Sequence, residues 1–218
     1  KKRSLIFAIL SSILLLGLLK IPLNGEFDNT FIFFLGRFHP IILHLPIGAL
    51  IILFFMELIN TINSKNNLDS ACNILLWFSV ISIIPTLLLG FLLGSSGNYD
   101  DELLNSHKWL GWFTALVCIW LVVIREKKSI SNPNKVSNFY KVFLFVNVIL
   151  LSLAGHYGGY LTHGEDYLTK YMPLAMKKMI GIENDNYEYL VINEEVNDSS
   201  SEAVYYEKTI RPIVQTYC

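Results

Sequence analysis

The chain has 218 residues, of which 53% are hydrophobic and 16% charged, and its mean hydropathy is +0.45. Soluble domains carry about 25% charged residues, so this composition predicts a membrane protein. A net charge of −1 offers no basic surface for nucleic acid, and nucleic acid is excluded as a partner. Three cysteines do not make a disulfide framework.

The first apolar segment follows three basic residues at positions 1–3 and runs from Leu5 to Leu19. Such a start is shared with signal peptides, but residues 18–22 (LLKIP) lack the small residues that cleavage requires. We therefore predict an uncleaved transmembrane helix. A polar loop over 22–30 follows it, and the apolar residues 31–35 are expected in the membrane interface.

Four further apolar segments predict an up-and-down bundle of helices, which makes five spans in all and an all-α membrane fold. Pro40 suits the first turn of the second span, whereas Pro46 inside it should kink the helix or free carbonyl groups near His44. The last span is short and could start at Asn138 or extend through Gly155. The predicted limits are about 40–62, 71–93, 107–124 and 142–153.

Loop charges predict the orientation of these spans, because cytoplasmic loops are enriched in Lys and Arg. Basic residues fall on one side of the predicted membrane: Lys1, Lys2, Arg3, Lys65, Arg125, Lys127, Lys128 and Lys135. The loops of the other side are acidic, with Glu26, Asp28, Asp100, Asp101 and Glu102. We predict a protein of the bacterial inner membrane with its N-terminus in the cytoplasm and its C-terminus in the periplasm.

All five histidines fall at the outer ends of the predicted spans. His39 and His44 lie in the stretch GRFHPIILHLPIG (36–48) at the start of the second span. His107 begins the fourth span, His156 ends the fifth, and His163 follows shortly after it. Ionisable side chains are rare within bilayers unless they have a function, so this gathering at one face predicts a site.

The predicted site holds haem b. On a regular helix His39 and His44 are roughly 140° apart, so they should not bind one metal together. The second and fourth spans are diagonal in an up-and-down bundle, which lets His44 and His107 approach the two faces of one haem. His39, His156 and His163 are candidates for a second ligand pair or for contacts with the haem edge, and Arg37 is a candidate partner of a propionate.

Three alternatives to a haem site stay open. The histidines could be interfacial residues whose hydrogen bonds go to water and backbone. A metal site built from His44, His107, His156 and His163 is possible, although structural zinc usually recruits thiolates. The glycine-rich stretch 154–167 (AGHYGGYLTHGEDY) could form part of a ligand site or an ordinary re-entrant turn.

The polar C-terminal part begins with a predicted short surface helix over about 171–182 and continues as an acidic linker over 183–203. Its last segment, 204–218 (VYYEKTIRPIVQTYC), resembles the opening helix of planctomycete-type cytochrome c domains. In those domains an I-R-P-I segment leads into a C-x-x-C-H haem attachment site. The resemblance implies that Cys218 is the first thioether cysteine and that haem c is attached there if the full-length chain continues as C-x-x-C-H.

The membrane part resembles an uncharacterised bacterial membrane-domain family that often precedes such cytochrome c domains. The matching pieces are HPIILHLPIG and GHYGGYLTHGEDYL. The resemblance implies a membrane-embedded partner for a c-type cytochrome domain, in cis or in trans. The resulting domain organisation is 1–35 for the first helix and loop, 36–168 for the bundle, 169–203 for the surface helix and linker, and 204–218 for the start of a cytochrome c-like domain.

These observations together predict an electron-transfer subunit of the membrane, with the bilayer, other membrane subunits and a possible quinol as its partners. A non-redox anchor that holds an extracytoplasmic module in a larger assembly is the first alternative. A metal-dependent membrane enzyme is the second.

Overall fold

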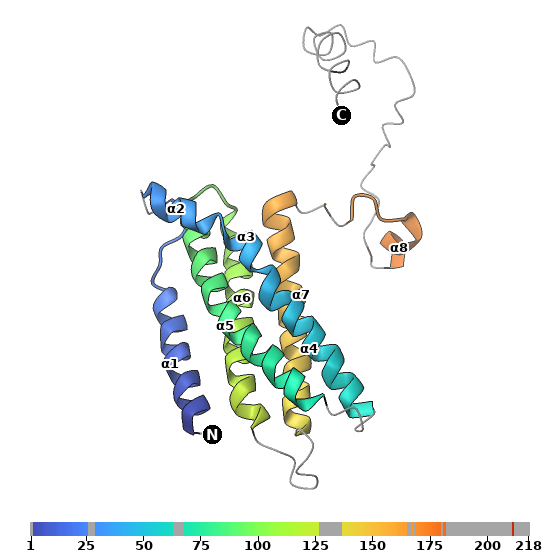
Figure 1. Cartoon of the computed structure of the whole chain (residues 1–218). Helices are drawn as coiled ribbons and strands as arrows, with labels where there is room; N and C mark the ends of the chain where they lie inside the picture. Colours follow the sequence, from blue (N-terminus) through green and yellow to red (C-terminus); the bar gives the residue numbers. More distant parts are fainter. Residues whose placement is uncertain are drawn as a thin grey trace, which may run out of the picture. The chain divides into compact units, whose positions relative to one another are not determined.

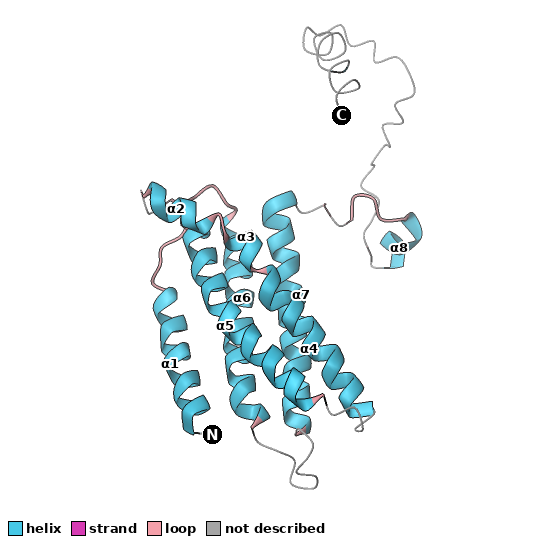
Figure 2. Ribbon diagram, viewed as in Figure 1, coloured by secondary structure: helices cyan, strands magenta, loops and turns pink. Residues whose placement is uncertain are grey.

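The computed structural model describes residues 2–25, 29–62, 68–126, 137–164, 167, 169–179, 181 and 211, and its secondary-structure elements there are helices joined by loops and turns (Figure 2). The chain divides into two compact units, Lys1–Lys170 and Tyr171–Cys218. The helices of the first unit are α1 (Lys2–Leu18), α2 (Thr30–Gly36), α3 (His39–Ile42), α4 (His44–Ile62), α5 (Asp69–Gly94), α6 (Asp101–Arg125) and α7 (Asn138–His163). The second contains α8 (Leu174–Met179).

Four helical segments are long and apolar enough to cross a membrane, namely the α2–α4 segment, α5, α6 and α7. Helices α4 and α6 each pack against both α5 and α7, so they lie diagonally in the bundle. Chain direction alternates from one helix to the next (Figure 1). The predicted all-α membrane fold with an up-and-down bundle is confirmed.

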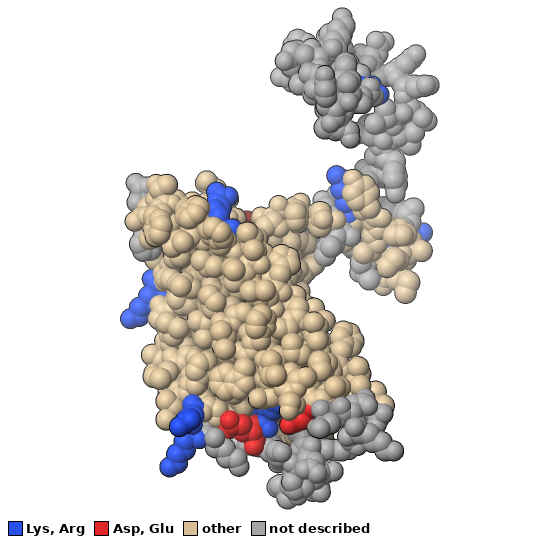
Figure 3. Space-filling view, in the orientation of Figure 1, with Lys and Arg blue, Asp and Glu red and all other residues tan. Residues whose placement is uncertain are grey.

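The two ends of this bundle differ in their side chains. We call the end at which α4 and α6 begin the histidine end, and the opposite end, at which α6 finishes with Arg125, the arginine end. Between them, the face shown in Figure 3 is a broad uncharged surface with its charged residues near the rims. Large apolar side chains such as Ile52, Phe55 and Ile81 are more than half exposed on the bundle, as lipid contact allows.

Helix α1 packs against α6 through a stripe of buried residues at helical spacing, Ser4, Ala8, Ser11, Leu15 and Leu18. Small residues in this stripe let the two helices approach closely. The Ser4 hydroxyl donates to Oε2 of Glu126, at 2.7 Å. Because α1 has 17 residues, about 26 Å at 1.5 Å per residue, it falls at the lower limit for a span, and its crossing stays a prediction.

A buried tryptophan ties α1 to the bundle. Nε1 of Trp112 on α6 donates to the Leu15 carbonyl oxygen at 3.0 Å, and its side chain is 7% exposed. Replacing Trp112 by Phe should lower the free energy of unfolding by about 1 kcal/mol, because the hydrogen bond is lost. Chemical denaturation in detergent micelles measures this loss. Trp109→Phe, at a position 38% exposed, is the control and should change stability less; equal losses would contradict the prediction.

The interruption expected near Pro46 is found at Leu43, between α3 and α4. Pro46 has no N–H group, so it cannot bond the Ile42 carbonyl as a helical residue would. Pro40 occupies the first turn of α3, where its missing N–H costs little. The break separates the first two histidines into different helices.

Helix α7 is longer than the span predicted from the sequence. It continues from Asn138 to His163 and ends at Gly164, whose φ of 87° is easily adopted without a Cβ. The stretch around His156 and the following glycines is therefore helical, and the alternative of a re-entrant turn there is wrong. Glycine is common inside membrane helices because neighbouring helices can pack closely against it.

The arginine end is held by a buried ion pair that the loop assignment of Arg125 missed. The Arg125 guanidinium donates to Glu57 on α4 and, at 2.8 Å, to Oδ1 of Asp69 on α5. It also lies 5.1 Å from the ring centre of Tyr140 on α7. Arg125 and Glu57 are 6% and 3% exposed. Arg125 is thus a core residue that contacts three other helices, and not a free charge of a basic loop.

The second unit carries the expected short helix within 171–182, but α8 covers only Leu174–Met179. Met176 and Met179 are more than half exposed, and Lys177 and Lys178 occupy its last turn. The acidic linker over 183–203 lies outside the described residues, as do most of 204–218 and Cys218 itself.

Candidate functional site

Two imidazole rings meet near the histidine end of the bundle. His39 on α3 and His107 on α6 have ring centres 6.4 Å apart, and their planes are inclined at 81°. Both side chains are partly buried. The diagonal placement of the second and fourth spans brings the rings together across the bundle. The sequence predicted this diagonal approach but with His44 in place of His39.

Each ring has one nitrogen fixed by a backbone carbonyl. Nδ1 of His39 lies 2.9 Å from the Thr86 carbonyl oxygen on α5, and Nδ1 of His107 lies 2.8 Å from that of Ala154 on α7. A carbonyl oxygen only accepts, so Nδ1 must carry the proton in both rings. In the neutral ring Nε2 then has a free lone pair. Neither Nε2 has a hydrogen-bond partner among the described residues.

A glycine lies against each ring. A Cβ atom added to Gly90 on α5 would stand 2.9 Å from Cε1 of His39, and one added to Gly158 on α7 would stand 2.9 Å from Cε1 of His107. Atoms do not approach so closely without displacement. The absence of a side chain at these two positions therefore makes room for the imidazoles.

The pair has the dimensions of two axial ligands on one metal. With about 2.0 Å from each nitrogen to the metal and roughly 1.1 Å from the nitrogen to the centre of an imidazole ring, collinear ligands place their ring centres about 6 Å apart. The observed separation is 6.4 Å. Metal-binding histidines also donate their other N–H to a carbonyl or carboxylate, as both rings do here. The ring separation and the two Nδ1 contacts thus match those of two histidines bound to one metal ion.

His44 occupies a different environment from His39. Its ring is exposed, and Nδ1 lies 2.6 Å from the carbonyl oxygen of Pro40, one turn earlier. The two histidines have different surroundings, since His39 is partly buried beside Thr86 and His44 is exposed. The ring beside His107 belongs to His39 and not, as predicted, to His44: Gly90 leaves space for the His39 imidazole, and the break at Leu43 places His44 on the next helix.

The remaining candidates lie outside this pair. The His156 ring packs on Tyr160, with ring centres 4.3 Å apart, and the His163 ring stacks on Tyr167 at the same distance. Arg37 caps α2 through its backbone N–H, and its side chain is exposed. All five histidines lie in the half of the bundle toward the histidine end, as predicted.

The described part of the chain contains no group of three or more His, Cys, Asp and Glu side chains placed to hold a metal ion. A typical zinc site uses three or four protein ligands. An axial haem site needs two, because the porphyrin supplies the other four nitrogens.

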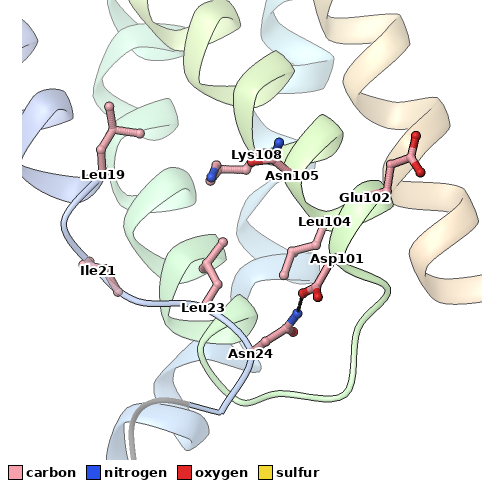
Figure 4. A pocket seen from close by; sticks show the side chains of 9 residues that line it. All are labelled: Leu19, Ile21, Leu23, Asn24, Asp101, Glu102, Leu104, Asn105 and Lys108. Carbon is pink, nitrogen blue, oxygen red and sulfur yellow. Dashed lines mark hydrogen bonds between the residues drawn. The ribbon is translucent and has the colours of Figure 1, made fainter.

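A groove of about 780 Å³ lies at the same end of the bundle, between the segment after α1 and the start of α6 (Figure 4). The Asn24 amide donates to the Asp101 carboxylate at its edge. Its lining combines apolar and polar side chains: Leu19, Ile21, Leu23, Asn24, Asp101, Glu102, Leu104, Asn105 and Lys108. His107 lies between two of these residues in the sequence.

Sequence reasoning missed the glycines and carbonyl groups that hold the two rings. One signal was available: each histidine is followed, 47 residues later, by the residue whose carbonyl it contacts, and a glycine stands four residues beyond. A comparison of the two halves of the chain would have selected His39 over His44.

Comparison with known families gives one match. The family described as "Predicted membrane protein (DUF2231)" matches residues 37–167. This range contains all five histidines and the helices α4, α5, α6 and α7. No curated protein and no solved structure matches the chain.

Proposed function

Because the chain belongs to the DUF2231 family of predicted membrane proteins, whose description states no activity, we propose its function from the histidine pair: it is an electron-transfer protein that holds haem b between His39 and His107. The expected membership of a membrane-domain family is confirmed by this match. The match ends at residue 167, so the cytochrome c resemblance of 204–218 stays a prediction.

One observation carries the proposal. Two imidazoles from diagonal helices stand 6.4 Å apart with their Nδ1 atoms bonded to carbonyls. In the neutral state both Nε2 atoms are hydrogen-bond acceptors, and two acceptors cannot form a hydrogen bond with each other. A metal could accept both lone pairs, and haem is a group that takes two protein ligands because the porphyrin supplies the other four nitrogens.

Haem b, when bound, supplies reversible one-electron chemistry between its ferric and ferrous states. His39 and His107 would hold the group, and the carbonyls of Thr86 and Ala154, which accept from the Nδ1–H groups, would orient the rings and keep each ligand basic. Both histidines would then be occupied as ligands, and neither would remain to act on oxygen or a substrate. The chemistry supported is therefore electron transfer rather than catalysis at the metal.

The proposed donor is a quinol and the proposed acceptor a c-type haem. The groove of Figure 4 supports a quinol, because it combines apolar side chains with polar ones, and Asn105 and Lys108 in its lining lie close to His107 in the sequence of α6. The acceptor is inferred from the resemblance of 204–218, with Cys218 as a haem attachment residue. We further propose that the histidine end faces the periplasm of the inner membrane and that other membrane subunits complete the assembly.

A visible spectrum tests the proposal. We expect the protein purified in mild detergent from haem-replete cells to show b-type bands in a reduced-minus-oxidised difference spectrum, with about one haem per chain by pyridine haemochrome assay. Reduction by a short-chain quinol should be slowed in Lys108→Met while reduction by dithionite is unchanged. A folded, colourless protein that takes up no added haem would contradict the proposal and favour the non-redox anchor.

A further inference from the structure

The two paired histidines make the same contacts in two successive helix hairpins. His39 precedes α4 and contacts the Thr86 carbonyl on α5, and His107 on α6 contacts the Ala154 carbonyl on α7. In both hairpins the contacted residue follows its histidine by 47 positions. Both hairpins begin and finish at the histidine end (Figure 1).

The glycines extend this correspondence. Gly90 follows Thr86 by four residues, and Gly158 follows Ala154 by four residues. Four residues are about one turn of helix, so each glycine lies just beyond the carbonyl on the same helix face. The imidazole atom nearest to a Cβ added at either glycine is Cε1, at 2.9 Å in both cases. The two hairpins thus agree in the position of the glycine, in its spacing from the contacted carbonyl and in the ring atom nearest to it.

The other histidines do not share this correspondence. The residue five positions after His107 is Trp112, so His44 has no counterpart in the second hairpin. The position in the first hairpin that corresponds to His156 holds Leu88. The repeated contacts therefore select His39 and His107 and exclude these two.

We propose that the bundle consists of two equivalent hairpins arranged about the histidine pair, and that Gly90 and Gly158 are the positioning residues that let each hairpin present its imidazole toward the shared centre. The assignment of haem to that centre rests on the proposed function, whereas the positioning role does not. A methyl group at either glycine would meet Cε1 and Nδ1 of the ring at 2.9–3.2 Å, so the ring must move from its present position beside the carbonyl.

Alanine variants of the α7 glycines test this role with a matched control. Gly158→Ala places a methyl against His107, whereas Gly159→Ala, at the next residue of the same helix, meets nothing within 4 Å. We expect haem affinity to fall at least about tenfold in Gly158→Ala, as for loss of other groups that orient a ligand, and the ferric electron paramagnetic resonance signal to change shape. Gly90→Ala should act alike, and Gly159→Ala should match the wild type.

A double-mutant cycle on the haem-free protein gives a readout that does not depend on the cofactor. If the ring causes the clash, the stability lost in Gly158→Ala should be recovered in His107→Ala/Gly158→Ala relative to His107→Ala alone. Equal losses in both backgrounds would overturn the positioning role. A protein that binds no haem but shows the expected cycle would overturn the proposed function and leave the positioning role standing. If Gly158→Ala does not fold, a double variant that folds as well as His107→Ala still shows that the His107 ring causes the clash.

Discussion

Replacing either His39 or His107 by alanine is expected to abolish the six-coordinate low-spin b-type spectrum, because on the proposed function each variant removes one of two haem ligands. Their near-perpendicular rings, at 81°, further predict a strongly anisotropic low-spin ferric signal in the wild-type protein. Visible and electron paramagnetic resonance spectra of the purified variants measure both effects. Added imidazole should restore a six-coordinate spectrum in a variant whose remaining ligand still holds the haem.

His44→Ala is the control for this experiment. His44 is exposed and its Nδ1 contacts only the preceding turn among the described residues, so the bands should persist. This variant separates the pairing seen in the structure from the one predicted from the sequence. Bands that vanish in His44→Ala and survive in His39→Ala would restore the pairing of His44 with His107.

Replacing Arg125 by methionine is expected to destabilise the bundle by about 3–5 kcal/mol, the usual cost of leaving one partner of a buried ion pair uncompensated. Glu57 is 3% exposed and would keep a charge with no counterion in the core. Because Arg125 contacts α4, α5 and α7, the arginine end should loosen first. Chemical denaturation in detergent micelles and limited proteolysis of that end measure the loss.

Two further variants identify the cause of that loss. The double variant Glu57→Gln/Arg125→Met removes both charges and should recover most of the stability. Asp69→Asn should change stability by less than about 1 kcal/mol, because the Asp69 side chain is 55% exposed and exposed ion pairs contribute little. A double variant as unstable as Arg125→Met would show that packing of the guanidinium on Tyr140, and not the buried charge, holds this end.

The spans were predictable because bilayer crossing imposes a local requirement. A helix must present about 20 apolar residues to span the hydrocarbon, and composition reveals such a run without knowledge of its neighbours. The residues at which the helices begin and end were harder to predict from the sequence. The last span was placed at about 142–153, yet α7 extends to His163, because glycine is tolerated inside membrane helices more than in soluble ones.

The buried role of Arg125 could not be read from the sequence. A basic residue at the end of an apolar segment has the same local pattern whether it reaches water or pairs with a carboxylate from another helix. Glu57 lies 68 residues earlier, and nothing local relates the two positions. Their pairing follows from the packing of α4 and α6 around a common core.

By itself, the sequence determined that this protein is an all-α membrane protein and that its histidines gather at one end of the bundle. Hydropathy and loop polarity are local properties of each segment, and the direction of each helix follows from the number of spans before it. Only the tertiary structure decided that His39, and not His44, lies beside His107. That pairing depends on Gly90 and Gly158, which leave room for an imidazole on a neighbouring helix. It also depends on which carbonyl groups lie within hydrogen-bond distance of Nδ1. Contacts between helices set both, and no single segment of the chain contains them.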